Sequence, residues 1–213
     1  MASDSNSGSS FAEPTFTDDR PNIQARARHR LVSRIFGGKP LCESVATHVH
    51  MAFHPEALWR CIQFYEEVPG RPPLLLRALI PAPVRSHGDK TAAGSKVLCL
   101  YDSGMLVKRI TTLEKPHLIE FELLEQSLGI ERCVVAEGGS YKIHWNGHDS
   151  TVVLTTNYLA YLRPRWLWAP LERLVVHQLH KHILGGMRKT LAAANAPSHN
   201  PIAGLQRTET LES

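Results

Sequence analysis

The last long apolar segment of the chain has helical spacing. From about residue 163 to 194, apolar side chains recur at steps of three and four, with most charged residues between them. The apolar positions are Leu171, Leu174, Val175, Leu179, Ile183, Met187 and Leu191. Pro170 fits only a first turn, so regular helix should begin near Leu167 and extend roughly 35 Å. The adjacent Gly185 and Gly186 predict a bend or a close contact with a neighbouring backbone.

The preceding segments alternate between apolar and polar residues, which is typical of half-buried strands. Strands are expected over residues 45–53, 74–80, 95–101, 105–113, 118–124, 140–145 and 150–162. A short helix is expected over residues 55–65 because Pro55 opens it, and residues 85–94 read as a loop. Asn146-Gly147 and Asp102-Ser103-Gly104 are hairpin signals. One long helix covering an antiparallel sheet is therefore the expected α+β architecture.

Composition fits one domain with tails. The chain has 213 residues, of which 43% are hydrophobic. Residues 1–40 lack a sustained period and predict a mostly disordered N-terminal tail. The expected folded domain spans residues 43–194, and residues 195–213 are expected to form a second disordered tail.

The charge distribution and the cysteine spacing argue against nucleic-acid-binding, zinc-knuckle and redox proteins. The net charge of +4 is spread among acids, and the densest basic stretch, residues 20–34, is too sparse for a nucleic-acid footprint. The four cysteines form no Cys-x-x-Cys pair, so neither a zinc knuckle nor a redox motif is indicated. The Ser-rich, acidic start does not resemble a signal peptide, and no apolar stretch has transmembrane length, so a cytoplasmic protein is expected.

The histidines predict no metal site. His177, His180 and His182 would point in three directions from a helix. His48 and His50 share one face of a strand, but no third ligand is evident and that face should meet solvent. We therefore expect neither a metal nor another cofactor.

The sequence resembles the SRPBCC, or START-like, helix-grip superfamily, which includes lipid-transfer domains and polyketide cyclase/dehydrases. The resemblance is carried by residues 54–59 (HPEALW), 104–110 (GMLVKRI) with Pro116, 138–141 (GGSY), and 155–158 (TTNY) leading into 163–165 (RPR). It covers roughly residues 43–194 and is a likeness of architecture, without a catalytic motif. It implies a curved antiparallel sheet of about six or seven strands around the C-terminal helix, with a largely apolar cavity between them.

The alternation of each element predicts which side chains would line that cavity. The candidates are Tyr101, Arg109, Ile110, Phe121, Tyr141, Trp145, Tyr158, Leu171, Val175 and His182. The orientation of the Arg109 side chain depends on the length of the hairpin loop that joins its strand to the strand of Phe121. A four-residue loop, residues 114–117, pairs Leu113 with Leu118, Ile110 with Phe121 and Arg109 with Glu122, which leaves Arg109 outside. A loop one residue longer or shorter turns it inward.

Three functions remain open at this level. A soluble module that binds, or binds and transports, a small hydrophobic or lipid-like molecule is favoured by the long amphipathic helix and the absence of a nucleophile–base signature. An enzyme resembling polyketide cyclase/dehydrases would use the same cavity with one or two proton-handling groups. A membrane-surface or interaction module is suggested by Trp166 and Trp168, which lie among Arg163, Arg165 and Arg173 as interfacial anchors do.

Overall fold

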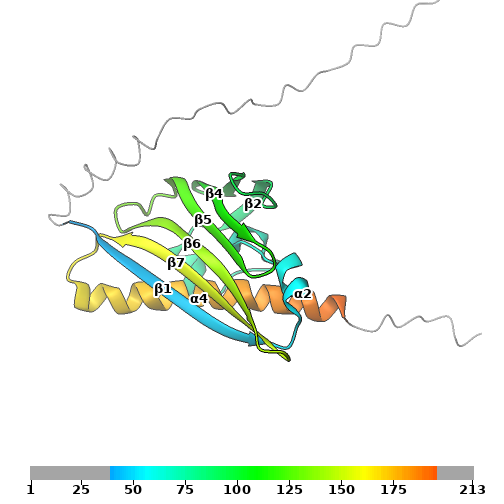
Figure 1. Cartoon of the computed structure of the whole chain (residues 1–213). Coiled ribbons are helices and arrows are strands. Elements are labelled where there is room, and N and C mark those ends of the chain that lie inside the picture. The colour runs from blue at the N-terminus through cyan, green and yellow to red at the C-terminus, as the bar shows by residue number, and fades with distance from the viewer. Residues whose placement is uncertain (1–38, 196–213) are drawn as a thin grey trace, which may run out of the picture.

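A computed structural model describes residues 39–195 and shows a seven-stranded antiparallel sheet with one long helix across it (Figure 1). The strands are β1 (Leu41–Met51), β2 (Pro83–Gly88), β3 (Lys96–Tyr101), β4 (Gly104–Glu114), β5 (Leu118–Ser127), β6 (Val134–Trp145) and β7 (Ser150–Ala160). The helices are α2 (Pro55–Arg60), the 3-10 turn η1 (Tyr65–Glu67), α3 (Leu74–Leu79) and α4 (Arg165–Ala194). The expected tails, residues 1–40 and 195–213, lie almost wholly outside the described residues.

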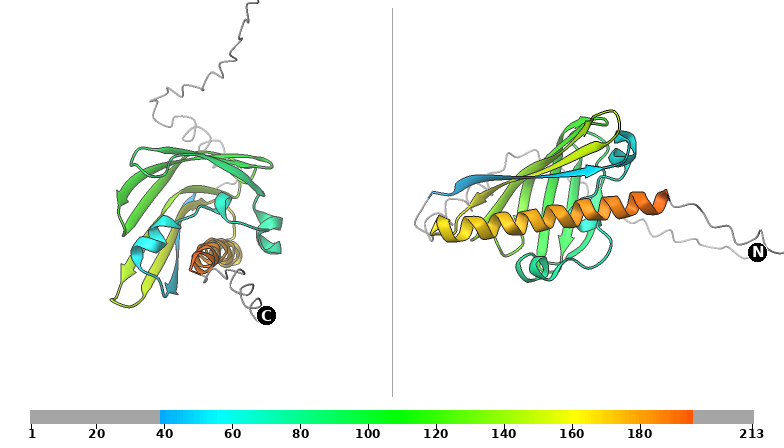
Figure 2. Two further views of the ribbon diagram at one scale, coloured as in Figure 1. Left: turned by 90° about the vertical axis from the view of Figure 1, so that its right-hand side faces the viewer. Right: turned by 90° about the horizontal axis from the view of Figure 1, so that it is seen from below.

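The sheet curves around α4. Its strand order is β1-β7-β6-β5-β4-β3-β2. The first strand in the sequence, β1, therefore pairs with the last, β7. An end-on view shows α4 in the hollow of the sheet, with α2 and α3 on either side of it (Figure 2, left). The architecture that the patterning predicts, one long helix covering an antiparallel sheet, is confirmed, and so is the curved helix-grip arrangement that the resemblance implies (Figure 2).

Helix α4 forms as its spacing predicts, with Pro164 as the preceding cap and Pro170 near its start. Its buried positions include His180, Ile183, Leu184, Met187 and Leu191, so the C-terminal half packs firmly against the core. The first half is more exposed. The helix therefore closes one end of the core and leaves apolar side chains uncovered at the other.

Two predictions about the segment between β1 and β3 are wrong. Residues 74–80 form α3 rather than a strand, because the run Leu74-Leu75-Leu76 has no alternation and no β-branched residue, and leucine favours helix. The expected loop at 85–94 contains most of β2, an edge strand whose largely exposed, polar sequence carries no hydrophobic period. The first helix is also shorter than expected: α2 ends at Arg60, and η1 follows as a separate turn.

The β4–β5 register confirms the outward orientation of Arg109. Arg109 pairs with Glu122 and Ile110 with Phe121, as the four-residue loop predicts. Leu113, however, pairs with Ile119 rather than Leu118. The ladder shifts by one residue between Ile110 and Thr112, so a bulge compensates for a loop one residue shorter.

Candidate functional site

Aromatic side chains fill the middle of the space between sheet and helix. Phe64 and Tyr65, from the start of η1, are buried against sheet residues. The Phe64 ring meets Phe121 edge-on at 5.2 Å between centroids, and Tyr65 stacks with Tyr101 at 6.4 Å. The Tyr141 hydroxyl donates to the Gln63 carbonyl oxygen. The η1 segment thus occupies the volume expected to be an apolar cavity.

A buried ion pair lies within this aromatic cluster. Lys108 Nζ is 3.0 Å from Glu66 Oε1 and 2.9 Å from Oε2, and the two side chains are 8% and 0% exposed. The Tyr101 hydroxyl donates to the same carboxylate. Lys108 Nζ also lies 4.4 Å from the centroid of the Phe64 ring, a cation–π distance. A Lys–Glu–Tyr cluster is therefore held between η1, β3 and β4.

The electrostatics keep this pair ionised. Burial opposes the charge of Glu66, but the Lys108 ammonium and the Tyr101 hydroxyl outweigh it and hold the pKa of Glu66 below its ordinary value. Burial likewise opposes the charge of Lys108, and Glu66 overcomes this and raises the Lys108 pKa. Burial raises the pKa of the neighbouring Cys99 thiol to about 12, so that thiol stays protonated at neutral pH.

Gln63 Oε1, on the residue before Phe64, is buried without a hydrogen-bond partner, and so are two further polar atoms beside this cluster. They are the Tyr65 hydroxyl and His182 Nε2, on side chains whose rings meet edge-on at 5.9 Å between centroids. Burial raises the pKa of Tyr65 to about 12, so its hydroxyl remains a donor. Burial lowers the pKa of His182, so the ring is neutral at neutral pH. One hydroxyl and one neutral imidazole nitrogen are thus available to a further group.

Polar contacts fix α4 to the edge of the sheet. The Thr47 hydroxyl is 2.8 Å from Nδ1 of both His177 and His180, and Thr156 Oγ1 is 2.8 Å from His180 Nε2. Nearer the start of the helix, Arg165 contacts Glu43 and Glu172 in a half-buried ion network. These contacts orient the helix, since hydrogen bonds are directional where apolar packing is not.

The predicted lining residues divide into three groups. Tyr101, Ile110, Tyr141 and Phe121 meet in the core beneath α4, with Val175 half-buried against them. Tyr158 is buried in a separate cluster with Val45, Ala160 and Val176, and its hydroxyl has no partner. His182 reaches the core beside Tyr65.

Three predicted lining residues lie elsewhere. Arg109 is on the outer face, where its guanidinium pairs with Glu122 and both side chains are about two-fifths exposed. Trp145 is 39% exposed because it ends β6 at the rim, where its ring packs on His54. Leu171 is 37% exposed on the uncovered side of α4. The β4–β5 register turns Arg109 outward, whereas Trp145 and Leu171 lie where the sheet does not extend far enough to cover them.

Sequence reasoning missed Lys108, Glu66 and Tyr65. A signal for Lys108 existed, because the β4–β5 register places Ile110 inside and Lys108 shares its face two residues away. Glu66 and Tyr65 lie in a 3-10 turn, where no period marks the buried side.

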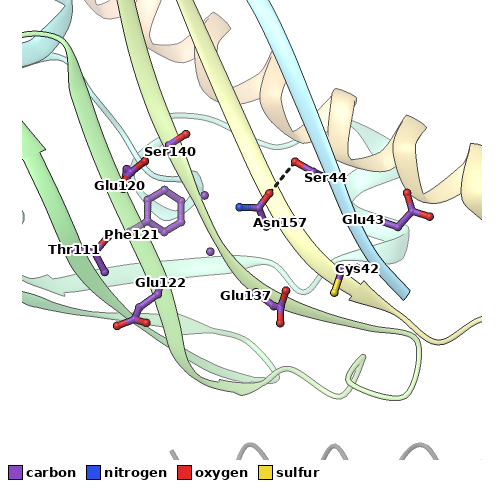
Figure 3. A pocket seen from close by; sticks show the side chains of 12 residues that line it. Cys42, Glu43, Ser44, Thr111, Glu120, Phe121, Glu122, Glu137, Ser140 and Asn157 are labelled. Carbon is purple, nitrogen blue, oxygen red and sulfur yellow. Dashed lines mark hydrogen bonds between the residues drawn. The ribbon is translucent and has the colours of Figure 1, made fainter. Parts of the chain in front are cut away.

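A hollow of about 500 Å³ lies on the opposite, outer face of the sheet (Figure 3). Glu120, Glu122 and Glu137 line it together with Ser44 and Asn157, which are joined by a 2.8 Å hydrogen bond. Gly138 and Gly139 form its floor at the β6 bulge, where a Cβ on either would meet backbone within 2.3 Å. The hollow is acidic and open, unlike the apolar cavity that was expected under the helix.

Within residues 39–195, no group of three His, Cys, Asp or Glu side chains is placed to hold a metal ion. In the same part of the chain, no helix is long and apolar enough to cross a membrane.

The geometry defines the class: a helix-grip protein in which a curved sheet and a long helix enclose a buried polar cluster. Solved structures share this fold. A norcoclaurine synthase point mutant from Thalictrum flavum, in complex with a transition state analogue, matches 74% of this chain and 98% of its own at 12% identity and a TM-score of 0.51. The same enzyme in complex with dopamine and hydroxybenzaldehyde matches 85% and 98% at 10% identity and a TM-score of 0.51.

An aromatase/cyclase from Streptomyces sp. R1128 matches 72% of this chain and 98% of its own, at 16% identity and a TM-score of 0.45. No family model matches the sequence, and no curated protein matches it. The two matches with a TM-score of 0.51 show a shared fold and confirm the expected helix-grip architecture.

Proposed function

We propose that this protein binds a small hydrophobic molecule between the middle of α4 and the η1–α3 segment. The observation that carries the proposal is the pair of unpartnered buried atoms, the Tyr65 hydroxyl and His182 Nε2. A buried polar group without a partner costs about 1–3 kcal/mol, so a ligand oxygen that bonds to one of them removes that cost.

The surroundings of these atoms suit an apolar ligand body. Val175 and Leu179 of α4 are only partly buried, and they border the cluster that contains Tyr65 and Leu76. Leu171 and Leu174 continue the same helix outward as exposed apolar residues. Apolar side chains of α4 therefore lie next to the cluster that holds these atoms, and burying them against a ligand supplies about 25 cal/mol per Å² before association costs are subtracted.

A matched pair of probes tests this proposal, because naphthalene and 2-naphthol differ only by a hydroxyl group. Both should compete with Nile red for the wild-type protein, with 2-naphthol binding about fivefold more tightly through one net hydrogen bond. In Tyr65→Phe the advantage of 2-naphthol should fall to about one. Tyr158→Phe is the control, because its hydroxyl is also buried and unpartnered but lies in a different cluster.

Native mass spectrometry of freshly purified protein provides the second arm. An adduct that is released on denaturation would support the proposal and identify the ligand's class. Failure of both probes to bind, together with a clean apo mass, would reject it.

A second function, cyclase- or dehydratase-type catalysis, is favoured by the Lys108–Glu66–Tyr101 cluster. An ammonium, a carboxylate and a phenol in hydrogen-bond contact are groups that general acid–base chemistry uses. Dehydration of the β-hydroxyketone 4-hydroxy-4-phenylbutan-2-one should then proceed faster than in buffer and lose that advantage in Lys108→Met. A wild-type rate equal to that in buffer would reject catalysis of this class.

A further inference from the structure

The exposed large apolar side chains gather on one side of the molecule. Within residues 39–195, seven of the nine lie on α3, the start of β2 or the first half of α4. They are Leu74, Leu79, Val84, Trp166, Leu167, Leu171 and Leu174, whereas Leu41 and Trp145 lie elsewhere. α3 and α4 are in contact with each other. Such a concentration marks an interaction surface, because single exposed apolar residues are normally scattered.

On α4 these residues form a continuous stripe. Leu167, Leu171 and Leu174 are spaced by four and three residues and so share one face of the helix. Trp166 lies beside them and is 78% exposed, the second most exposed of the large apolar side chains. An indole with this exposure is typical of the boundary between lipid headgroups and acyl chains.

The same elements are basic. Residues 71–88 contain Arg71, Arg77 and Arg85, all exposed, and no acid. In α4 the single acid, Glu172, is buried against Arg165, whereas Lys181 and Arg188 are exposed. The exposed charges of these elements are therefore positive, although the exposed Asp102 carboxylate accepts a hydrogen bond from Ala82 N beside the start of β2.

Three acids lie on the other side. Glu120, Glu122 and Glu137 point outward from the face of the sheet away from α4 (Figure 3). Figure 2 shows that α4 and α3 lie on the side of the molecule opposite that face. The protein thus has a basic, apolar side and an acidic side, a polarity that orients a molecule on a charged surface.

We propose that the side formed by α3, the start of β2 and the first half of α4 docks on an anionic membrane surface. Trp166 and the leucine stripe enter the headgroup region, while Arg71, Arg77, Arg85 and Lys181 contact anionic lipid. A second copy is a poorer occupant, because a symmetric contact would bring these cations against each other. Docking here goes beyond ligand binding, and it would place the exposed apolar side chains of the first half of α4 against the lipid.

Co-sedimentation of the full chain with vesicles tests the proposal. Wild-type protein should pellet with phosphatidylcholine vesicles that contain phosphatidylserine, and much less with phosphatidylcholine alone. Trp166→Ser/Leu174→Ser should lower the partition coefficient by about tenfold or more, because it removes two inserted side chains. Trp145→Ser, which alters an exposed indole at the far rim, should leave partitioning unchanged.

A charge variant separates lipid electrostatics from apolar insertion. Arg77→Gln/Lys181→Gln should weaken binding to phosphatidylserine vesicles by about thirtyfold, at roughly 1 kcal/mol for each of the two cations, without changing the thermal midpoint. Residues 20–34 are present in every variant, so their charge cancels from the comparison.

Equal pelleting of wild type and Trp166→Ser/Leu174→Ser would overturn the proposal. So would light scattering that shows a wild-type dimer and a monomeric variant, since that result assigns the surface to a second copy. Neither result bears on the naphthol comparison, so the docking and ligand-binding proposals fail separately.

Discussion

The Lys108 ammonium lies 2.9 Å from the Glu66 carboxylate, beneath the Phe64 ring and almost out of reach of solvent. Removing one charge leaves the other buried and uncompensated. Glu66→Gln should therefore lower the free energy of unfolding by about 3–5 kcal/mol, measured by urea denaturation.

Replacing both charges provides the sharper comparison. Glu66→Leu/Lys108→Met should be considerably more stable than Glu66→Gln, since an apolar pair of similar volume avoids the cost of a lone charge. Arg109→Ala, which breaks an exposed ion pair on the same strand, should cost less than about 1 kcal/mol. If Glu66→Gln and Arg109→Ala cost the same, the buried pair has been misassigned.

The buried His180 predicts acid sensitivity. Burial is the main cause that lowers its pKa to about 3, with a smaller contribution from the neighbouring His177. The unfolded chain has an ordinary imidazole pKa near 6.5, so below that value the unfolded state binds a proton that the folded state does not. Stability from His180 is complete above about pH 6.5 and declines toward pH 3, by about 1.4 kcal/mol per pH unit.

A variant isolates this contribution. His180→Gln cannot titrate, so its unfolding free energy should fall less steeply than that of the wild type between about pH 6 and 4. Urea denaturation at each pH gives the two slopes of unfolding free energy against pH. Their difference should approach the value for uptake of one proton, about 1.4 kcal/mol per pH unit. Parallel slopes would show that His180 is protonated in the folded state.

The sequence predicts the long helix and the strands of this molecule better than it predicts which side chains fill the core. Long periodic segments such as α4 and β7 have one dominant pattern, and the register of Arg109 against Glu122 followed from hairpin geometry. The η1 turn has no period, yet it supplies Phe64, Tyr65 and Glu66 to the core. Whether a cavity is open or filled depends on such irregular segments, and local pattern carries no information about which side chains they insert.

The pair Gly185-Gly186 shows the same division between pattern and packing. The spacing correctly marked this point in α4 as unusual, but the two glycines have different surroundings. A Cβ on Gly185 would meet nothing within 4 Å, whereas a Cβ on Gly186 would lie 2.7 Å from Val68 Cγ1 and 3.2 Å from Gln63 Oε1. The close neighbours are the side chains that hold the η1 segment against α4, rather than the neighbouring backbone that was one of the two expectations.

Two alanine variants should therefore change stability in opposite directions. Gly185→Ala should raise the free energy of unfolding by about 0.5–1 kcal/mol, because alanine favours helix and the space is open. Gly186→Ala should lower it by about 1–3 kcal/mol, because the added methyl must displace Val68. Adding Val68→Ala to Gly186→Ala should recover part of that loss. If it recovers none, Val68 is not the side chain that the added methyl displaces.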